Sequence, residues 1–99
     1  MKKFRTYQLA VQFYKLGRSI NLPRHLKDQF LRASSSIVLN LAEGSAKSSQ
    51  ADRRKFYEIS LASTKECQAI LELESNEELS RLLDTLAAHS YRLVQSLKS

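Results

Sequence analysis

Apolar side chains recur every three or four residues along four successive segments of the chain, which is the spacing of helices that bury one face. The first segment runs from about Phe4 to Ser19 and ends at Asn21-Leu22-Pro23, because the residue before a proline avoids helical geometry. Its predicted buried stripe is Leu9, Phe13, Leu16 and Ile20.

The second helix is expected to begin near Arg24 to Leu26 and to stop at Gly44, since glycine is common just past a helix end. Ser45 to Ser49 then form a short polar loop, in which Ser48 or Ser49 can cap the third helix. The predicted buried stripe of the second helix is Leu26, Phe30, Ala33, Ile37 and Leu41.

The third and fourth helices meet at a junction where Ser75 and Glu78 have capping-box spacing, so that each side chain can satisfy the other residue's backbone amide. The third helix is predicted to bury Phe56, Ile59, Ser63, Cys67 and Ile70, with Leu61 and Leu71 beside them. The fourth is predicted to bury Leu79, Leu83, Leu86, Ser90, Leu93 and Leu97, with Leu82 and Val94 widening the stripe.

Four such helices joined by short loops predict an all-α fold, an up-down-up-down antiparallel four-helix bundle in a single domain of residues 1–99. Only 2 Gly and 1 Pro are present, too few for the turns of many strands. No apolar run is long enough to span a membrane, and polar residues interrupt the stretch after Met-Lys-Lys that a signal peptide needs. We therefore expect the protein in the cytoplasm, without a membrane partner.

The net charge is +6, and its distribution along the chain is uneven. Residues 1–27 contain seven basic residues and no acid, whereas residues 66–84 contain six acidic residues and Arg81 as the one base. These segments are either solvated helix faces that neutralise one another, within or between chains, or a basic surface for a polyanion. Arg53, Arg54 and Lys55, with Lys47 nearby, form the densest basic cluster, which suits a phosphate or an acidic patch on another subunit.

Asn40 and Glu43 are polar residues three apart in an otherwise apolar run at the end of the second helix. Glu43 falls where the helix dipole disfavours a carboxylate, so we expect it to have a partner. Structurally, Glu43 would accept hydrogen bonds from amides at the start of the third helix or from Arg53 or Arg54, while Asn40 ties two helices together. The functional alternative is that Glu43 binds a partner molecule or an ion.

The sequence offers little material for catalysis. Cys67 lies on an apolar stripe, which is the usual place of a buried structural cysteine, and the two histidines His25 and His89 have no neighbours at nucleophile or metal spacing. A bundle metal site needs Glu-x-x-His pairs, and a phosphate loop needs glycines; neither motif is present. We expect no enzyme activity, no metal and no cofactor.

Tyr7 and Tyr14 lie one heptad apart and off the predicted buried stripe of the first helix. Tyrosine is favoured at interfaces because it combines apolar area with a hydrogen-bonding tip. These two residues therefore indicate a second contact face, used for self-association.

Several short motifs lie along the second and third predicted helices: Arg32-Ala33-Ser34, Ser36-Ile37, Asn40-Leu41-Ala42-Glu43-Gly44, Phe56 through Ser63, and Glu66. Together they resemble the signature of the bacterial four helix bundle protein family, whose members include proteins encoded within intervening sequences of 23S ribosomal RNA genes. The family is similar to the accessory variability determinant of diversity-generating retroelements, a basic, barrel-shaped homopentamer that binds nucleic acid and a reverse transcriptase. One departure is Ala62-Ser63-Thr64-Lys65-Glu66, where the family often has a Gly-Ser step followed by a leucine and an acidic pair.

The resemblance implies an up-down bundle, a ring-shaped homo-oligomer (a pentamer by likeness) and RNA binding, without an enzyme activity. Our leading hypothesis is a non-enzymatic homo-oligomer that binds RNA or DNA through backbone phosphates. The alternative is an adaptor that assembles with its own copies or with a protein partner and binds no nucleic acid; a hydrolase using Cys67 is a third hypothesis. The candidate phosphate contacts are Lys2, Lys3, Arg5, Arg18, Arg24, Lys27, Arg53 and Arg54.

Overall fold

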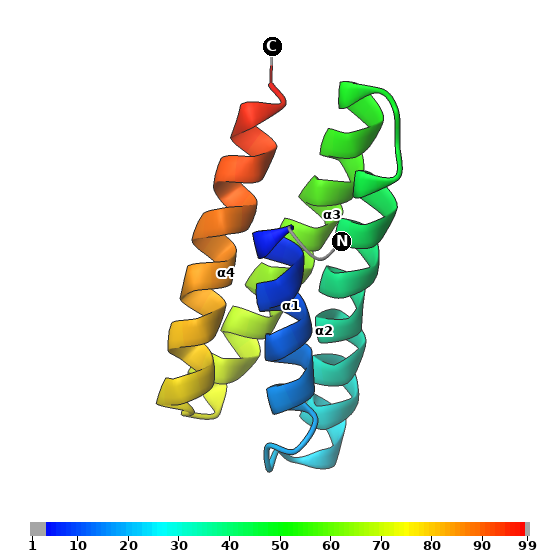
Figure 1. Cartoon of the computed structure of the whole chain (residues 1–99). Coiled ribbons are helices and arrows are strands. Elements are labelled where there is room, and N and C mark those ends of the chain that lie inside the picture. The colour runs from blue at the N-terminus through cyan, green and yellow to red at the C-terminus, as the bar shows by residue number, and fades with distance from the viewer. Residues whose placement is uncertain (1–3, 99) are drawn as a thin grey trace.

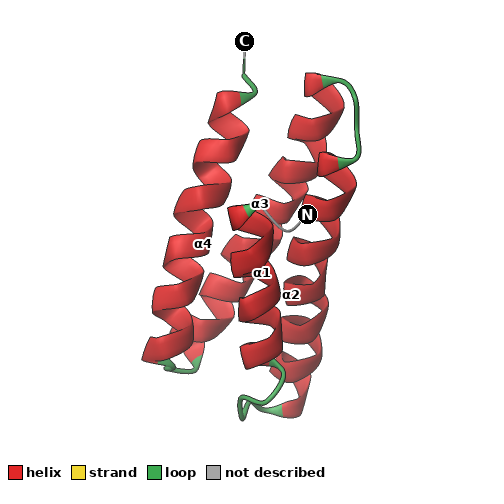
Figure 2. Cartoon of the chain, in the orientation of Figure 1, coloured by secondary structure: helices red, strands yellow, loops and turns green. Residues whose placement is uncertain are grey.

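Four helices form an antiparallel bundle in the computed structural model, which describes residues 4–98. Helix α1 spans Arg5–Gly17, α2 spans Arg24–Ser45, α3 spans Gln50–Leu73 and α4 spans Glu77–Ser96 (Figure 1). Helices α1 and α3 each pack on both α2 and α4, and residues 4–98 contain helices and loops but no strand (Figure 2). The chain is thus an all-α, up-down-up-down four-helix bundle, as the apolar pattern predicts.

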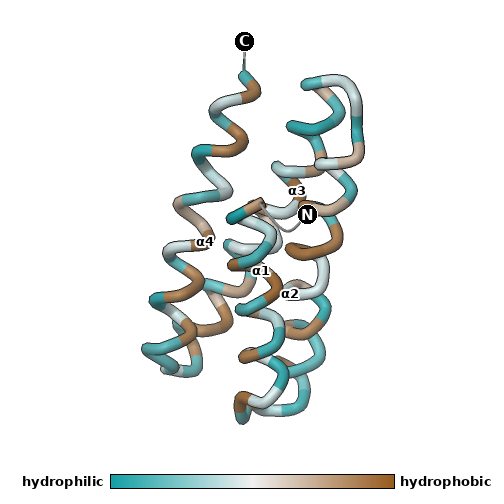
Figure 3. The backbone as a smooth tube through the Cα atoms, viewed as in Figure 1, coloured by the Kyte–Doolittle hydropathy of each residue, from teal (hydrophilic) through white to brown (hydrophobic). Residues whose placement is uncertain are grey.

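The core lies along the shared axis of the bundle, and hydrophobic positions alternate with hydrophilic ones along each of the four helices (Figure 3). The rings of Phe13 in α1 and Phe30 in α2 pack with their centroids 5.6 Å apart at 59°, a favourable tilted arrangement. Burial of each such large side chain contributes about 1.5–3 kcal/mol. Other fully buried side chains are Ile37, Leu41, Cys67, Leu83 and Leu86.

The first helix is shorter than predicted, and this changes its buried face. It ends at Gly17, so Ile20 lies in the following loop, and the side chain of Leu16 is 40% exposed. The prediction that Leu16 is buried was wrong because the stripe continues through Gly17 instead. The ring of Phe30 occupies the space beside Gly17, where an added Cβ would lie 2.6 Å from Phe30 Cε2.

Gly44 does not stop the second helix. It lies inside α2, which continues to Ser45, and its φ is not positive, so it is not a left-handed cap. The glycine instead allows α3 to approach, because an added Cβ would lie 2.6 Å from Tyr57 Cε1 and 3.2 Å from Phe56 Cβ. The sequence predicts a helix end at this glycine, but what the position requires is space between two helices.

The buried face of α3 also differs from the predicted one. Ile59 is 40% exposed and Phe56 is half-buried, whereas Cys67 and Ile70 are buried as predicted. The buried face of α3 is rotated about the helix axis relative to the predicted one, because α3 packs on both α2 and α4. On the α2 side, the Ser60 hydroxyl donates to the Ile37 carbonyl at 2.9 Å. The full buried set is Tyr57, Ser60, Thr64, Cys67, Ile70 and Leu71.

The two junctions on either side of α3 are capped by side chains. Ser49 caps α3 as one of the two predicted candidates, accepting a hydrogen bond from the Asp52 amide at 3.1 Å. At the start of α4 the cap is Asn76, which accepts from the Leu79 amide at 3.0 Å, so the predicted capping box of Ser75 with Glu78 was wrong. The buried residues of α4 are Leu79, Leu83, Leu86, Ser90 and Val94, with Leu93 and Leu97 half-buried.

A Gly44→Ala substitution tests the close approach of α2 and α3. We expect it to lower the free energy of unfolding by about 1–3 kcal/mol through overpacking against Tyr57, although alanine is otherwise the better helix former. Urea denaturation followed by circular dichroism at 222 nm measures the change. In a Tyr57→Leu background the same substitution should be neutral or stabilising; an equal decrease in both backgrounds would contradict the steric explanation.

Candidate nucleic-acid interface

The loop between α2 and α3 has side-chain hydrogen bonds at both of its sides. Arg53 Nε donates to the Lys47 carbonyl at 2.7 Å, while the Ser49 side chain caps α3. The Lys47 ammonium in turn lies 2.9 Å from the Glu43 carboxylate. These contacts connect the basic segment to the end of α2 and to the start of α3.

Two lysines of this segment flank one aromatic ring. Lys47 Nζ lies 5.2 Å and Lys55 Nζ 5.9 Å from the centroid of the half-buried Phe56 ring, and both distances suit a cation–π interaction. Arg54 Nε lies 3.9 Å from a Glu58 carboxylate oxygen, a loose contact at the surface that contributes little stability. These charges therefore remain available to a ligand.

The end of α4 brings further positive charge to the same end of the bundle, because α4 runs parallel to α2 and both helices end there (Figure 1). Arg92 and Lys98 are both exposed at this end. We call this end of the molecule, with its six basic residues, the loop end: Lys47, Arg53, Arg54, Lys55, Arg92 and Lys98. The acids near it are Glu43, Asp52 and Glu58, of which two are paired with loop-end cations.

The opposite end of the bundle mixes both signs of charge. Its basic residues lie in the α1–α2 loop and the start of α2, and most of its acidic residues lie in and beside the α3–α4 loop. Residues 20–22 and 73–76 line one shared hollow. The Lys27 ammonium donates to the carbonyls of Arg18 and Ile20, which satisfies orphan groups after α1. The acids at this end are Asp28, Glu72, Glu74, Glu77 and Glu78.

The eight candidate phosphate contacts are therefore not gathered on one surface. Arg53 and Arg54 lie at the loop end, whereas Arg18, Arg24 and Lys27 lie at the opposite end, separated by the length of α2, roughly 30 Å at 1.5 Å per residue. Arg5 begins α1, part-way along the bundle (Figure 1). Lys2 and Lys3 lie outside the described residues. Arg92 and Lys98 are not among the phosphate contacts predicted from the sequence. They lie at the same end as the α2–α3 loop because of the antiparallel packing of the helices, which local spacing does not reveal.

Asn40 and Glu43 have separate partners. Asn40 Nδ2 donates to the Ser36 carbonyl at 2.9 Å and to the Ser36 hydroxyl at 3.0 Å, and that hydroxyl shares a 2.9 Å hydrogen bond with Ser63 of α3. Asn40 thus supports the α2–α3 contact through Ser36. Glu43 pairs with Lys47, and not with the partners that the sequence predicts for it at the start of α3.

Cys67, His25 and His89, the candidate catalytic groups, differ in their exposure to solvent. Cys67 is fully buried, and burial, with a smaller contribution from Glu66, raises the pKa of its thiol to about 12. His25 is exposed in the first turn of α2, and His89 lies half-buried in α4. Among residues 4–98, no three His, Cys, Asp or Glu side chains are grouped so that they could hold a metal ion.

The comparison with protein families decides the relationship that the residue pattern indicates. The family model of the 23S rRNA-intervening sequence protein matches residues 3–97. The chain belongs to this family. No curated protein and no solved structure matches it. None of the helices within residues 4–98 has the length and apolar character needed to cross a membrane.

The buried thiol gives a direct test of the Cys67 environment. At pH 8 a thiol with a pKa near 12 has roughly 1000-fold less thiolate than one with the ordinary value of 9.0, so its reaction with Ellman's reagent should be slower by about that factor. Absorbance at 412 nm follows the reaction, with the same protein in denaturing urea as the control. Equal rates in the folded and unfolded protein would show that Cys67 is accessible and reactive.

Proposed function

We propose that this protein is a non-enzymatic RNA-binding protein that contacts backbone phosphates through the loop end. The observation that carries the proposal is the gathering of six cations at one end of the bundle, where two of the three nearby carboxylates are already paired. Such a surface raises the local concentration of a polyanion and neutralises its phosphates. The opposite end does not have this property, because carboxylates from the α3–α4 loop accompany its cations.

Membership of a family named for 23S rRNA-intervening sequences favours RNA over DNA as the polyanion. The Phe56 ring at the loop end is half-buried beside two lysines, so it is not presented for stacking on a base. Binding should therefore depend on phosphates and little on base sequence.

The loop-end cations have different roles in this proposal. Arg53 holds the loop through the Lys47 carbonyl, so its removal would also change the shape of the surface. We assign the phosphate contacts chiefly to Arg54, Arg92 and Lys98, of which Arg54 is half-buried and the other two are exposed. Because side-chain hydrogen bonds already order the loop in the free protein, less conformational entropy would be lost when RNA binds.

We propose in addition that the protein is a homo-oligomer, with five copies by its likeness to the accessory variability determinant. Exposed apolar side chains support self-association, since Leu39 and Leu73 are 65% and 70% exposed. The same observation favours the adaptor alternative, in which the charged surfaces bind other copies and no nucleic acid. Measuring RNA binding separates the two functions.

Replacing two loop-end cations should weaken RNA binding without unfolding the protein. For Arg54→Gln/Arg92→Gln, the slope of log K against log salt should fall by about one for each phosphate that the variant no longer neutralises, and the affinity at 0.1 M salt should fall about tenfold or more. Fluorescence anisotropy with a labelled mixed-sequence RNA of about 20 nucleotides, at salt from 50 to 200 mM, measures both quantities.

The matched control is Arg18→Gln/Arg24→Gln, which removes the same net charge at the opposite end. This variant should retain nearly the parent affinity. Equal weakening by both double variants would point to net charge alone, and absence of binding by the parent protein at 50 mM salt would leave the adaptor function as the better hypothesis.

A further inference from the structure

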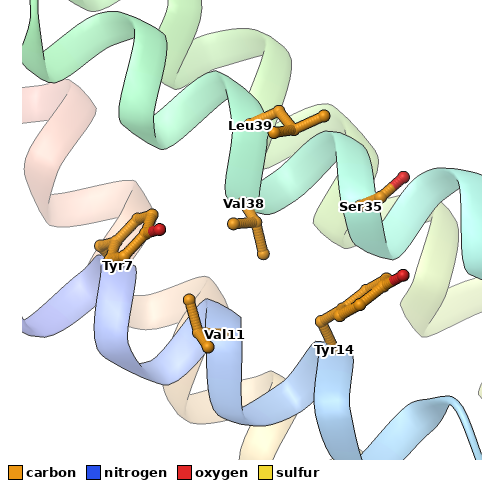
Figure 4. Close-up of a pocket in the computed structure, with 6 residues that line it drawn as sticks. All are labelled: Tyr7, Val11, Tyr14, Ser35, Val38 and Leu39. Atoms are coloured by element: carbon orange, nitrogen blue, oxygen red, sulfur yellow. The ribbon is translucent and has the colours of Figure 1, made fainter.

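An apolar groove runs between α1 and α2 on the outside of the bundle. It encloses about 380 Å³ and is lined by Tyr7, Val11 and Tyr14 of α1 and by Ser35, Val38 and Leu39 of α2. Figure 4 shows the two tyrosines on either side of Val11, with Val38 facing them from α2 and Leu39 on the outer edge of that helix. Tyr7 and Tyr14, the residues that indicated a second contact face, thus lie in one groove whose edge is a leucine that is 65% exposed.

A ridge of matching character lies on the outside of α3. Ile59, Ala62, Glu66, Ala69 and Leu73 are spaced by three, four, three and four residues, and all five are exposed. This spacing is that of a helix packed along another helix at a shallow angle. We call these five residues the α3 ridge. Within residues 4–98, α3 packs on α2 and α4 through other positions, and the ridge is left in solvent.

The charges on the two surfaces are arranged in complementary order along the bundle. From the loop end, α2 presents Glu43, Leu39 and Arg32, and α3 presents Lys55, Ile59 and Glu66; the members of both sets are four and then seven residues apart. When two copies are aligned in the same direction, these sets fall opposite each other. Glu43 of one copy then faces Lys55 of the other, Leu39 faces Ile59, and Arg32 faces Glu66. In residues 4–98, no ion pair involves Arg32, Lys55 or Glu66, and Glu43 pairs with Lys47 at the surface.

From these observations we infer that the α1–α2 groove receives the α3 ridge of a second copy of the chain aligned in parallel. The inference rests on the self-association in the proposed function and names the surfaces that would form it. A copy of the same chain is the occupant that the charge order fits, because the complementary sequence of charges is present on the protein itself. Complementary charges across an interface fix its register.

The arrangement is head-to-tail, since the groove of one copy contacts the ridge of the next and each copy has one of each. The ridge faces the α2 side of α3, because Ser63, one turn after Ile59, bonds to Ser36 of α2. Groove and ridge therefore lie on adjacent sides of the bundle, so successive copies turn in the same sense about an axis parallel to the helices. A repeated turn of this kind closes a chain of subunits into a ring when the successive rotations add up to one full turn, and otherwise gives an open filament.

Two single substitutions remove one surface each. Leu39→Arg places a charge at the groove, and Ile59→Arg places one on the ridge; each should weaken self-association by about 30-fold or more, the decrease that follows removal of an apolar anchor. Sedimentation velocity over a range of concentrations measures the mass. Ala62→Arg repeats the ridge test at a second exposed residue of α3, and Gln12→Arg, exposed on α1 away from the groove, is the control with the same charge change.

Mixing the two variants gives the decisive result. The Leu39→Arg copy keeps an intact ridge and the Ile59→Arg copy keeps an intact groove, so the equimolar mixture should form a dimer of one copy of each, while either variant alone is monomeric. Loss of assembly in Leu39→Arg only would indicate groove-to-groove pairing and overturn the inference. An oligomeric parent that no variant disturbs would overturn it while leaving self-association in place. A monomeric parent at millimolar concentration would overturn both, and the RNA titration with the loop-end variants is independent of either outcome.

Discussion

The close contact between α2 and α3 is the constraint on which the rest of the structure depends. Small and hydroxyl-bearing residues line it: Gly44 leaves space for the Tyr57 ring, and the Ser60 hydroxyl reaches the Ile37 carbonyl. A hydrogen bond of this kind contributes about 1 kcal/mol, but its geometric effect is larger, because it fixes how far one helix is displaced along the other. That displacement determines how the end of α2 lies relative to the start of α3, and so how Lys47 lies relative to Arg53 and Arg54.

The apolar spacing is sufficient to predict four helices and their order, and it fails at the edges of the buried faces. A single stripe drawn through each helix places Ile59 and Leu16 in the core, whereas each helix in a bundle has two contact sides. Glycine is common at helix ends, so the sequence predicts that Gly44 ends the second helix. The contact that requires a glycine there is with the Tyr57 ring, which is 13 residues away in the chain and is not predictable from the residues around Gly44. Capping is predictable only in part: Ser49 is one of two candidates, and the cap at Asn76 is missed beside Ser75.

The candidate site shows the same limit more clearly. The basic cluster around Arg53 and Arg54 can be recognised in the sequence because its members are adjacent in the chain. Sequence cannot separate that cluster from Arg18 and Arg24, nor join Arg92 and Lys98 to it, because both relations depend on which helix ends lie together. In the structure the two ends of the bundle differ in charge. The acidic residues in and beside the α3–α4 loop lie close to the α1–α2 loop, whereas the loop end has more basic than acidic residues.

The two proposals together explain how a small and only moderately basic protein could hold RNA firmly. A single loop end offers few phosphate contacts, and binding through so few is weak at physiological salt. A ring built by docking the α3 ridge into the α1–α2 groove would keep all copies parallel, so every loop end would face the same side of the assembly. Contacts from several copies to one RNA then combine, and linked binding of this kind can exceed the affinity of one site by about 10²–10⁴. Of the six loop-end cations, Lys55 is the one that the inferred pairing of copies would use, so assembly would leave the other five for RNA.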